Sequence, residues 1–532
     1  MASSERPEPK VRSERPPATI DPALRRIAIV VVLGIIMSIL DTTIVIVAID
    51  TLGRQFDTTL SAIQWVSTGY LLALSTVIPL SGWAVERFGA KRMWIISLVL
   101  FVLGSMLCGL AWSAPSLIIF RVLQGFGGGM IMPIGMTILA REAGPARMGR
   151  VMGLIGVPAL LAPVFGPVIG GLLVDNLSWR WIFYVNLPVG IIALVLAARM
   201  LPADKELSKS RLDVVGLALI SPGLAAIVYG LSEAGSSGSL TNSKVIAGVV
   251  VGVALLAAFA VHALRADDPL LDLRLYKNRT FTVASLTTGV VGAVLFGAMF
   301  VLPLYYQVVR GYSALDAGLL LAPQGLGAMI AMPIGGRIVD RAGAGRVVPF
   351  GILAIAAGTL AYTQVTPDTS IVLLAASLFV RGLGMGFVMM PAMSSAYIHL
   401  SRAEVPRATT MVNIVQRVGG SIGTALFAVV LERQIVAGLP AAAGGGENAI
   451  GGSVVGTPVA GIISGAFGTT FWWVVGLTLL ALIPALLLPR VGAAAALAAA
   501  EPGASTREPE ATATAIDDLT DGAPMAGAAQ RP

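Results

Sequence analysis

Residues 79–92 read Pro-Leu-Ser-Gly-Trp-Ala-Val-Glu-Arg-Phe-Gly-Ala-Lys-Arg, and residues 333–346 repeat the pattern as Pro-Ile-Gly-Gly-Arg-Ile-Val-Asp-Arg-Ala-Gly-Ala-Gly-Arg. Every match between the two stretches is offset by 254 residues. A fainter echo sets Arg121 and Pro133 against Arg381 and Pro391. The chain therefore consists of two related halves.

The composition identifies the class of protein to which these halves belong. Residues of the AVILMFWYC set make up 56% of the 532 residues, and charged residues make up only 12%. Soluble globular proteins carry about 25% charged residues. We therefore expect an all-α polytopic membrane protein. The net charge of +7 is ascribed to membrane topology and not to nucleic-acid binding, because the sequence has no basic patch.

The positions of the charges predict fourteen membrane-spanning helices, because a crossing helix needs roughly 20 mostly apolar residues. The runs without a charge are 58–85, 93–120, 151–174, 181–198, 214–232, 245–264, 280–309, 317–336, 347–367 and 448–489. The spans with one internal charge are 27–49 around Asp41, 117–140 around Arg121, 371–397 around Arg381 and 407–431 around Arg417.

The basic residues predict the orientation, since Lys and Arg are retained on the cytoplasmic side of short loops. With the N-terminus inside, the cytoplasmic segments carry most of the 36 basic residues. We expect a multi-pass protein of the cell (plasma or inner) membrane with both termini in the cytoplasm. Residues 1–26 and 491–532 lack periodicity and are predicted to be disordered cytoplasmic tails.

The repeat also predicts the order of the spans. The spans at 58–85 and 317–336 are equivalent and run the same way, so the halves are parallel and related by an axis along the membrane normal. The predicted order is a six-helix half at 27–200, an inserted helix pair with its loops at 201–278, and a six-helix half at 279–490. Such halves usually enclose a substrate site near the midplane, which predicts transport. An ATP-driven pump is not expected, because no lysine follows a glycine, as a phosphate-binding loop requires.

Asp41 is the one acidic residue well inside a span, and it is the candidate proton carrier. A charge at that depth costs about 2.5–3.5 kcal/mol or more, so it suggests a function. The alternative is a carboxylate that only fixes helix packing. Arg121 is its expected companion, since both residues lie in the outer half of the membrane; alternatively, Arg121 only binds backbone carbonyls. The same two interpretations stay open for Arg381 and Arg417.

The repeated loop is predicted to be a gate, because glycine permits close helix approach while charges can pair in one conformation and part in another. The alternative, that these charges only set topology, does not explain the glycines or their recurrence. The candidate gate residues are Gly82, Glu86, Arg87, Gly89, Lys91, Arg92, Gly336, Asp340 and Arg341.

Other spans supply candidate pivot and cavity residues. Two prolines and three glycines within 162–171 predict a kinked helix, with Gly166, Pro167, Gly170 and Gly171 as its key positions. Candidate substrate-binding residues are Trp65, Tyr70, Gln124, Tyr305, Gln307, Asn413 and Gln416. Met385, Met389 and Met393 share one helix face, as ordinary core or as an adaptable pocket wall. Cys108 is the only cysteine, so no intramolecular disulfide is possible and a metal site is not expected. No cofactor is expected either.

These residues resemble the motifs of the major facilitator superfamily, and within it the fourteen-helix drug:proton antiporters of the EmrB/QacA type. Residues 82–92 look like the superfamily's gate motif, and residues 121–125 look like its proton-coupling motif. Residues 166–171 look like the antiporter motif, and residues 40–45 and 179–188 look like signatures of the fourteen-helix group. One departure concerns the helix at 317–336, which has no acid at mid-membrane, since Asp316 lies at its outer end.

The resemblance implies a proton-coupled multidrug exporter of amphipathic, lipophilic compounds that works as a monomer among membrane lipids and binds no nucleic acid. Export of a dedicated lipid or secondary metabolite, with incidental drug efflux, is the alternative. An intramembrane enzyme is not expected, because the two histidines lie too far apart in the sequence for a zinc-binding pair. A receptor would have little use for the repeat.

Overall fold

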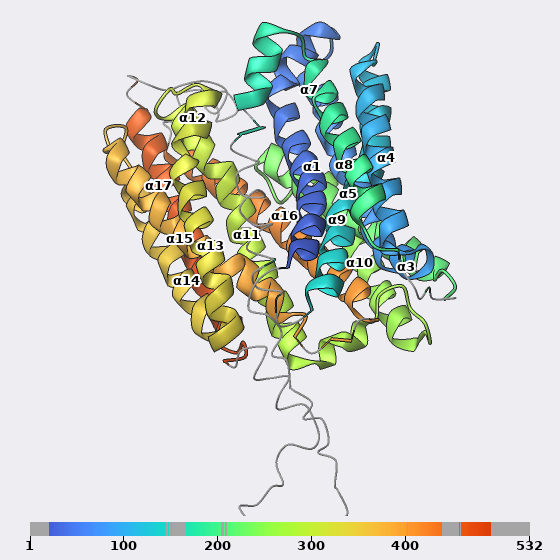
Figure 1. Ribbon diagram of the computed structural model, residues 1–532. Helices are drawn as coiled ribbons and strands as arrows, with labels where there is room; N and C mark the ends of the chain where they lie inside the picture. The colour runs from blue at the N-terminus through green and yellow to red at the C-terminus, as the bar shows by residue number, and fades with distance from the viewer. Residues whose placement is uncertain are drawn as a thin grey trace, which may run out of the picture.

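The computed structural model describes these residues: 21–144, 147, 151, 165–166, 168–203, 207, 210–398, 400–401, 403–438, 457 and 459–490. Regular structure in these residues is entirely helical. Figure 1 shows the helices as two groups, one from each end of the sequence, which approach each other most closely where α16 crosses toward the N-terminal group.

The N-terminal group begins with α1 and ends with α8. Its helices are α1 (Pro22–Gln55), α2 (Leu60–Val77), α3 (Leu80–Phe88), α4 (Ala90–Gly109), α5 (Ala114–Ala143), α7 (Trp181–Tyr184) and α8 (Asn186–Met200). Residues 168–176 are also helical.

The C-terminal group runs from α11 to α18. Its helices are α11 (Arg279–Val308), α12 (Ala314–Leu320), α13 (Ala322–Ala342), α14 (Ala344–Leu360), η3 (Ala361–Gln364), α15 (Ile371–Ser395), α16 (Val405–Gly438), α17 (Ala460–Leu480) and α18 (Leu482–Ala485). Between the groups come α9 (Val214–Ser237), α10 (Ser243–Arg265) and the short η2 (Leu273–Lys277).

The described residues contain twelve helices long and apolar enough to cross a membrane, or thirteen if α2 and α3 are counted as one bent span. The span predicted at 151–174 lies largely outside the described residues, so the total of fourteen stays a prediction. The span predicted at 58–85 is bent by 54° between α2 and α3, where Pro79 cannot continue the hydrogen-bond ladder. The tail predicted at 491–532 lies outside the described residues. Of the tail predicted at 1–26, residues 22–26 are helical and form the start of α1.

The internal repeat is visible in the backbone conformation of its turns. Gly89, between α3 and α4, has φ 90° and ψ 147°, and Gly343, between α13 and α14, has φ 81° and ψ 155°. In each turn the glycine N–H donates to the carbonyl four residues earlier, at Val85 or Val339, over 2.9 Å. A positive φ of this size favours glycine. The two halves therefore share a local geometry as well as a sequence.

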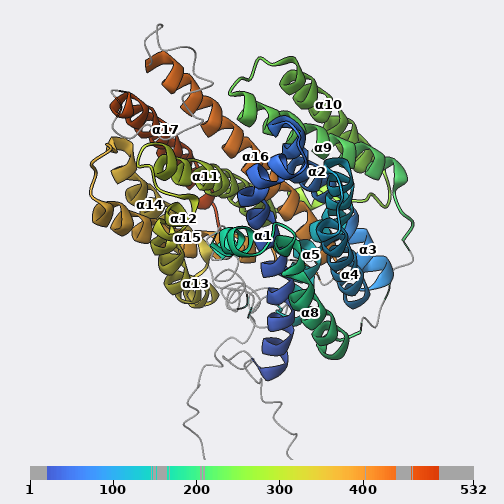
Figure 2. The ribbon, with the colours of Figure 1, turned by 90° about the horizontal axis from the view of Figure 1, so that it is seen from above.

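Helix α9 packs on α10 and bridges the two groups. The Cα of Gly230 lies 2.8 Å from the Cβ that an alanine at Gly248 would carry, so their backbones meet closely. Ser221 of α9 donates to the Thr76 carbonyl of α2 over 2.6 Å. On its other side α9 packs against α16, and Figure 2 shows the pair beside α2 and α16.

Small residues also let the N-terminal helices close around large buried side chains. Trp94 of α4 is fully buried and fills the space left by Gly34 of α1 and Gly135 of α5. Gly125 of α5 lies directly against the Tyr70 carbonyl of α2. Packing of this kind replaces the hydrophobic effect as the cohesive force between helices in lipid, and it holds α1, α2, α4 and α5 in fixed register around Asp41.

Candidate functional site

Asp41 and Arg121 form a buried ion pair in the N-terminal group. Nη1 of Arg121 on α5 donates to Oδ2 of Asp41 on α1 over 2.6 Å. The side chains are 0% and 1% exposed, respectively. Burying two charges is tolerable only when they are paired and further hydrogen-bonded. The structure places Asp41 and Arg121, which the sequence predicts to be partners, in direct contact.

Two amides complete the shell around the Asp41 carboxylate. Gln124 Nε2 and Asn186 Nδ2 both donate to Oδ1, over 2.9 Å and 2.8 Å. Asn186 also donates to Ser105 Oγ over 3.0 Å, and Ser105 in turn donates to the Phe183 carbonyl over 2.9 Å. Asp41 thus accepts from three donors on α5 and α8, an arrangement that fits an ionised carboxylate.

Arg121 is held by more than its carboxylate partner. Its Nη1 also donates to Gln124 Oε1 over 2.7 Å, and its Nε donates to the Val66 carbonyl over 3.3 Å. Its guanidinium carbon lies 3.9 Å from the centroid of the Tyr70 ring, within range of a cation–π interaction. Arg121 therefore binds a backbone carbonyl and pairs with Asp41 at once, so it does not bind backbone carbonyls alone.

The glycines of the 166–171 segment pack on α1 close to Asp41. A Cβ on Gly166 would collide with the Thr43 side chain, and one on Gly170 would lie 3.1 Å from the Ile44 carbonyl. Gly171 faces open space, with nothing within 4 Å of a Cβ. Pro167 and residues 162–164 lie outside the described residues, so the kink predicted there stays a prediction. The described glycines bring this helix against the chain segment that carries the carboxylate.

A second charge cluster joins the two helix groups. Glu86 on α3 accepts from Arg407 on α16, with Nε 3.0 Å from Oε1 and Nη2 3.0 Å from Oε2. Arg407 also donates to Asp268 Oδ1 over 2.7 Å and to the Pro269 carbonyl over 3.2 Å. This bidentate pair crosses from the N-terminal half to the C-terminal half, at the end where α1 begins.

Small and polar residues beside Glu86 bring α3 and α16 into direct contact. A Cβ on Gly82 would lie 3.3 Å from both the Arg407 Cα and the Pro406 carbonyl. One turn away, the hydroxyl oxygens of Ser81 and Thr410 are 3.0 Å apart. The halves are therefore closed against each other at this end.

The remaining predicted gate residues do not all share this contact. Lys91 donates to the Ala198 carbonyl of α8 over 2.8 Å, within its own half. Arg87, Arg92 and Arg341 are exposed. Gly336 is buried in α13, and the side chain of Asp340 lies outside what the structure describes.

The predicted cavity residues are dispersed. Tyr70 and Gln124 belong to the Asp41 cluster, whereas Trp65 is 41% exposed and stacks on Tyr229 of α9. The other four lie in the C-terminal group. Tyr305 is buried and donates to the Thr366 carbonyl, Gln307 and Asn413 donate to backbone within their own helices, and Gln416 is buried.

Several members of these clusters were not predicted to take part in them. Asn186 stands in the 179–188 stretch that resembles a family signature, but no pattern in the sequence points it at Asp41. Cys108 donates to Gln124 Oε1 over 3.6 Å, and Ser105 lies one turn before it. Arg407 lies in the first turn of α16, and in the sequence it cannot be distinguished from an ordinary loop arginine. Only the packing of α4, α8 and α16 reveals these partners.

With this geometry established, the chain was compared with known proteins. The sequence model described as Major Facilitator Superfamily matches residues 31–424. A multidrug resistance protein B homolog of Mycobacterium tuberculosis (strain H37Rv) is 45% identical over 421 residues, covering 79% of this chain and 78% of the relative. Multidrug export protein EmrB of Escherichia coli is 32% identical over 397 residues, covering 74% and 77%.

Two solved structures share the fold at low sequence identity. The proton:xylose symporter XylE matches with a TM-score of 0.59 and 13% identity, covering 89% of this chain and 99% of its own. The human organic anion transporter MFSD10 matches with a TM-score of 0.59 and 16% identity, covering 87% and 100%. Likenesses at this identity concern the fold alone.

Proposed function

This chain belongs to the major facilitator superfamily, and from that premise we propose that it is a proton-coupled exporter of amphipathic, lipophilic compounds. The relatives named for multidrug resistance and multidrug export support the choice of substrate class. The observation that carries the proposal is the buried Asp41 carboxylate with its three donors. Proton coupling needs a titratable group inside the membrane, and Asp41 is the carboxylate found there among the described residues.

The surroundings of Asp41 suggest how a proton would act. With Asp41 ionised, Arg121, Gln124 and Asn186 all donate to it. Protonation removes the negative charge that holds Arg121 and adds a donor where donors already converge. The three partners must then rearrange. Because those partners lie on α5 and α8, a proton at Asp41 loosens the attachment of α1 to both helices.

The Glu86–Arg407 contact supplies the other element of an alternating-access cycle. Such cycles move one half against the other around a central site. The pair and the Ser81–Thr410 contact hold the halves together at one end, which we assign to the cytoplasmic face from the loop charges. Opening this end to load substrate requires both contacts to break.

The energy available from one proton is adequate for export. A proton moving down about 100 mV supplies about 2.3 kcal/mol, which corresponds to roughly a fifty-fold substrate gradient. In this proposal the protein is a monomer in the cell membrane with both termini cytoplasmic. It has two halves at 27–200 and 279–490, and the segment 201–278 that carries α9 and α10 lies between them.

The decisive experiment reconstitutes the purified protein in liposomes with an imposed pH gradient and a panel of lipophilic dyes. Asp41→Asn keeps the size of the side chain and its hydrogen bonding in part but cannot carry a proton. We expect it to abolish gradient-driven dye movement and the substrate-induced proton signal. Asp316→Asn, which changes a carboxylate at the exposed start of α12, is the matched control. Full transport by Asp41→Asn, at the wild-type level, contradicts the proposal.

A further inference from the structure

Arg381 on α15 is the counterpart of Arg121 in the second half. It is 1% exposed. Arg121 packs over the ring of Tyr70, whereas Arg381 donates through Nη1 to Oε1 of Gln324. Tyr70 and Gln324 occupy equivalent positions of the repeat, because they are 254 residues apart. The repeat offset read from the gate loops thus also relates the neighbours of the two arginines.

Among its described residues, the second half has no carboxylate paired with Arg381 as Asp41 is paired with Arg121 in the first half. The position 254 residues after Asp41 is Leu295 of α11. Arg381 forms no salt bridge with any residue the structure describes, and its Nε and Nη2 atoms meet no hydrogen-bond acceptor among those residues. A buried guanidinium without a counter-charge is among the most costly groups that a membrane protein can hold. A group of this cost suggests a function.

The Nε and Nη2 donors of Arg381 indicate what kind of acceptor group would pair with them. Nε and Nη2 lie along one edge of the planar guanidinium group, and that edge offers two parallel N–H bonds. A carboxylate accepts such a pair in bidentate fashion. Gln324 accepts from Nη1, and no acceptor from the described residues meets the Nε–Nη2 edge, so within the described part of the chain that edge is available to a ligand.

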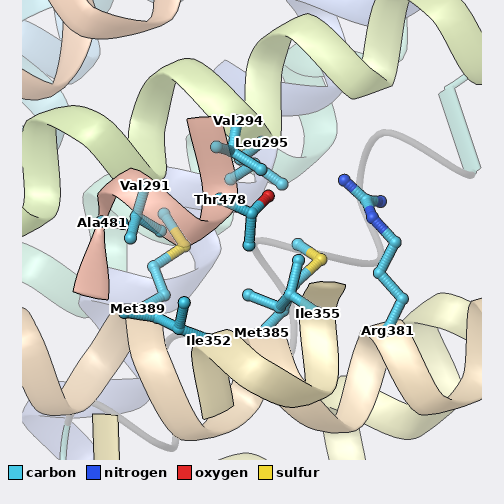
Figure 3. A pocket seen from close by; sticks show the side chains of 10 residues that line it. All are labelled: Val291, Val294, Leu295, Ile352, Ile355, Arg381, Met385, Met389, Thr478 and Ala481. Atoms are coloured by element: carbon cyan, nitrogen blue, oxygen red, sulfur yellow. The ribbon is translucent and has the colours of Figure 1, made fainter. Parts of the chain in front are cut away.

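Beside Arg381 lies a small apolar cavity. Its walls come from α11, α14, α15 and the end of α17, and they include Leu295, Ile355, Met385 and Met389. Figure 3 shows Arg381 reaching from α15, next to Met385, toward the helix that carries Val294 and Leu295. The cavity has a volume of about 10 Å³, room for about one water molecule. Methionine side chains are flexible, so Met385 and Met389 can withdraw to enlarge it.

The balance of charge inside the membrane favours an anion. Asp41 is already paired with Arg121. Arg417 of α16 is a second central arginine that forms no salt bridge with a described residue. The middle of the described spans therefore carries excess positive charge, which repels cations and attracts an acid.

We propose that Arg381 binds the carboxylate of an amphipathic organic acid, whose apolar body enters the adjoining cavity between α11, α14 and α15. This assignment rests on the proposed export function and narrows its substrates to lipophilic acids. It involves neither Asp41 nor the proton, so the two proposals can fail separately.

The test measures equilibrium binding to the purified full-length protein in lipid nanodiscs, without any gradient. The probes are 11-(dansylamino)undecanoic acid and its methyl ester, which differ only in the carboxylate. We expect the wild type to bind the acid at least tenfold more tightly than the ester. Arg381→Gln should reduce acid affinity at least tenfold and leave ester affinity within about twofold, because a charge-assisted bidentate bond is lost. Arg381→Lys should retain part of the preference.

The thermal midpoint of the same variants separates a ligand-binding role from a structural one. Removing an uncompensated buried charge should leave the midpoint of Arg381→Gln unchanged or raise it. Equal binding of acid and ester by the wild type, or an unchanged acid affinity in Arg381→Gln, overturns the assignment. A midpoint of Arg381→Gln several degrees below that of the wild type also overturns it, since Arg381 would then serve to hold Gln324. Loss of dye transport in Asp41→Asn with normal acid binding leaves it standing.

Discussion

Ser81 and Thr410 belong to different halves of the chain, yet their hydroxyl oxygens lie 3.0 Å apart in a buried contact between α3 and α16. Because the two hydroxyl oxygens are in contact, cysteines at these positions would place their sulfur atoms close to each other. We expect Ser81→Cys/Thr410→Cys, in a Cys108→Ser background, to form a disulfide on mild oxidation. Transport in proteoliposomes should then stop and return on reduction, because the halves cannot part at this end. Undiminished transport by fully oxidised protein would show that α3 and α16 need not separate.

Gly166 provides a test of how closely the antiporter-like segment must approach α1. Gly166→Ala places a methyl group against Thr43, and overpacking of this kind costs about 1–3 kcal/mol. We expect a lower thermal midpoint and at least tenfold slower dye transport. Gly171→Ala, which faces open space, is the control and should behave like wild type. Adding Thr43→Ala to Gly166→Ala should restore much of the lost stability and transport, because it removes the side chain that collides with the new methyl group. If the double variant is no better than Gly166→Ala, the collision with Thr43 is not the cause of the defect.

Asn186 should tune the response of transport to pH. Its amide donates to the Asp41 carboxylate, so Asn186→Ala removes one of the donors that stabilise the ionised form. We expect the pH of half-maximal transport to move upward by about 0.5–1 unit, with the thermal midpoint little changed. The measurement is dye transport between pH 5 and 9 in liposomes. Asn176→Ala, which changes an exposed amide on the helical segment 168–176, should leave the profile in place; an identical shift there would refute the assignment.

Asp213 should make stability depend on pH at the base of the inserted helix pair. Burial raises the pKa of Asp213, but N–H donors from Gly216 and Leu270 and the His262 side chain outweigh it and lower the pKa below its ordinary value. A lowered pKa contributes stability above the unfolded-state value, and that stability is lost as pH falls through the folded-state value. Asp213→Ala should lower the thermal midpoint at pH 7 and flatten its decline toward pH 3.

The control for Asp213 is Asp267→Ala, which alters an exposed carboxylate near the end of α10. Thermal midpoints of both variants would be followed from pH 3 to 7 in detergent. If Asp213→Ala keeps the wild-type decline, the acid sensitivity comes from other groups.

Much of the fold is predictable from sequence, because the length of an apolar run is tied to the thickness of the membrane. The pairing of Asp41 with Arg121 is predictable for a related reason, since two buried charges of opposite sign need each other. Partners supplied by tertiary packing are a different matter. Arg407 is 321 positions from Glu86, and nothing local distinguishes it from other loop arginines. Asn186 is one of several span-end amides, and only the seating of α8 on α1 and α4 brings it to the carboxylate.

The bend at Pro79 between α2 and α3 could not be predicted from the positions of the charges. An uncharged run of suitable length predicts one helix over 58–85, and the proline within it is the only sign that α2 and α3 diverge. The equivalent run at 317–336 is interrupted near its start, between α12 and α13. Charge positions therefore locate the spans but do not show where a span bends or is interrupted.

The paired turns at Gly89 and Gly343 also bear on the history of the chain. Any other side chain at these positions would strain the backbone by roughly 1–3 kcal/mol, so substitutions there destabilise the turn even where the helices of the two halves differ. The helix faces have diverged, one retaining an acid and the other a leucine, while the turns have not. Two glycines 254 residues apart thus serve as a record of duplication at the turns that they form.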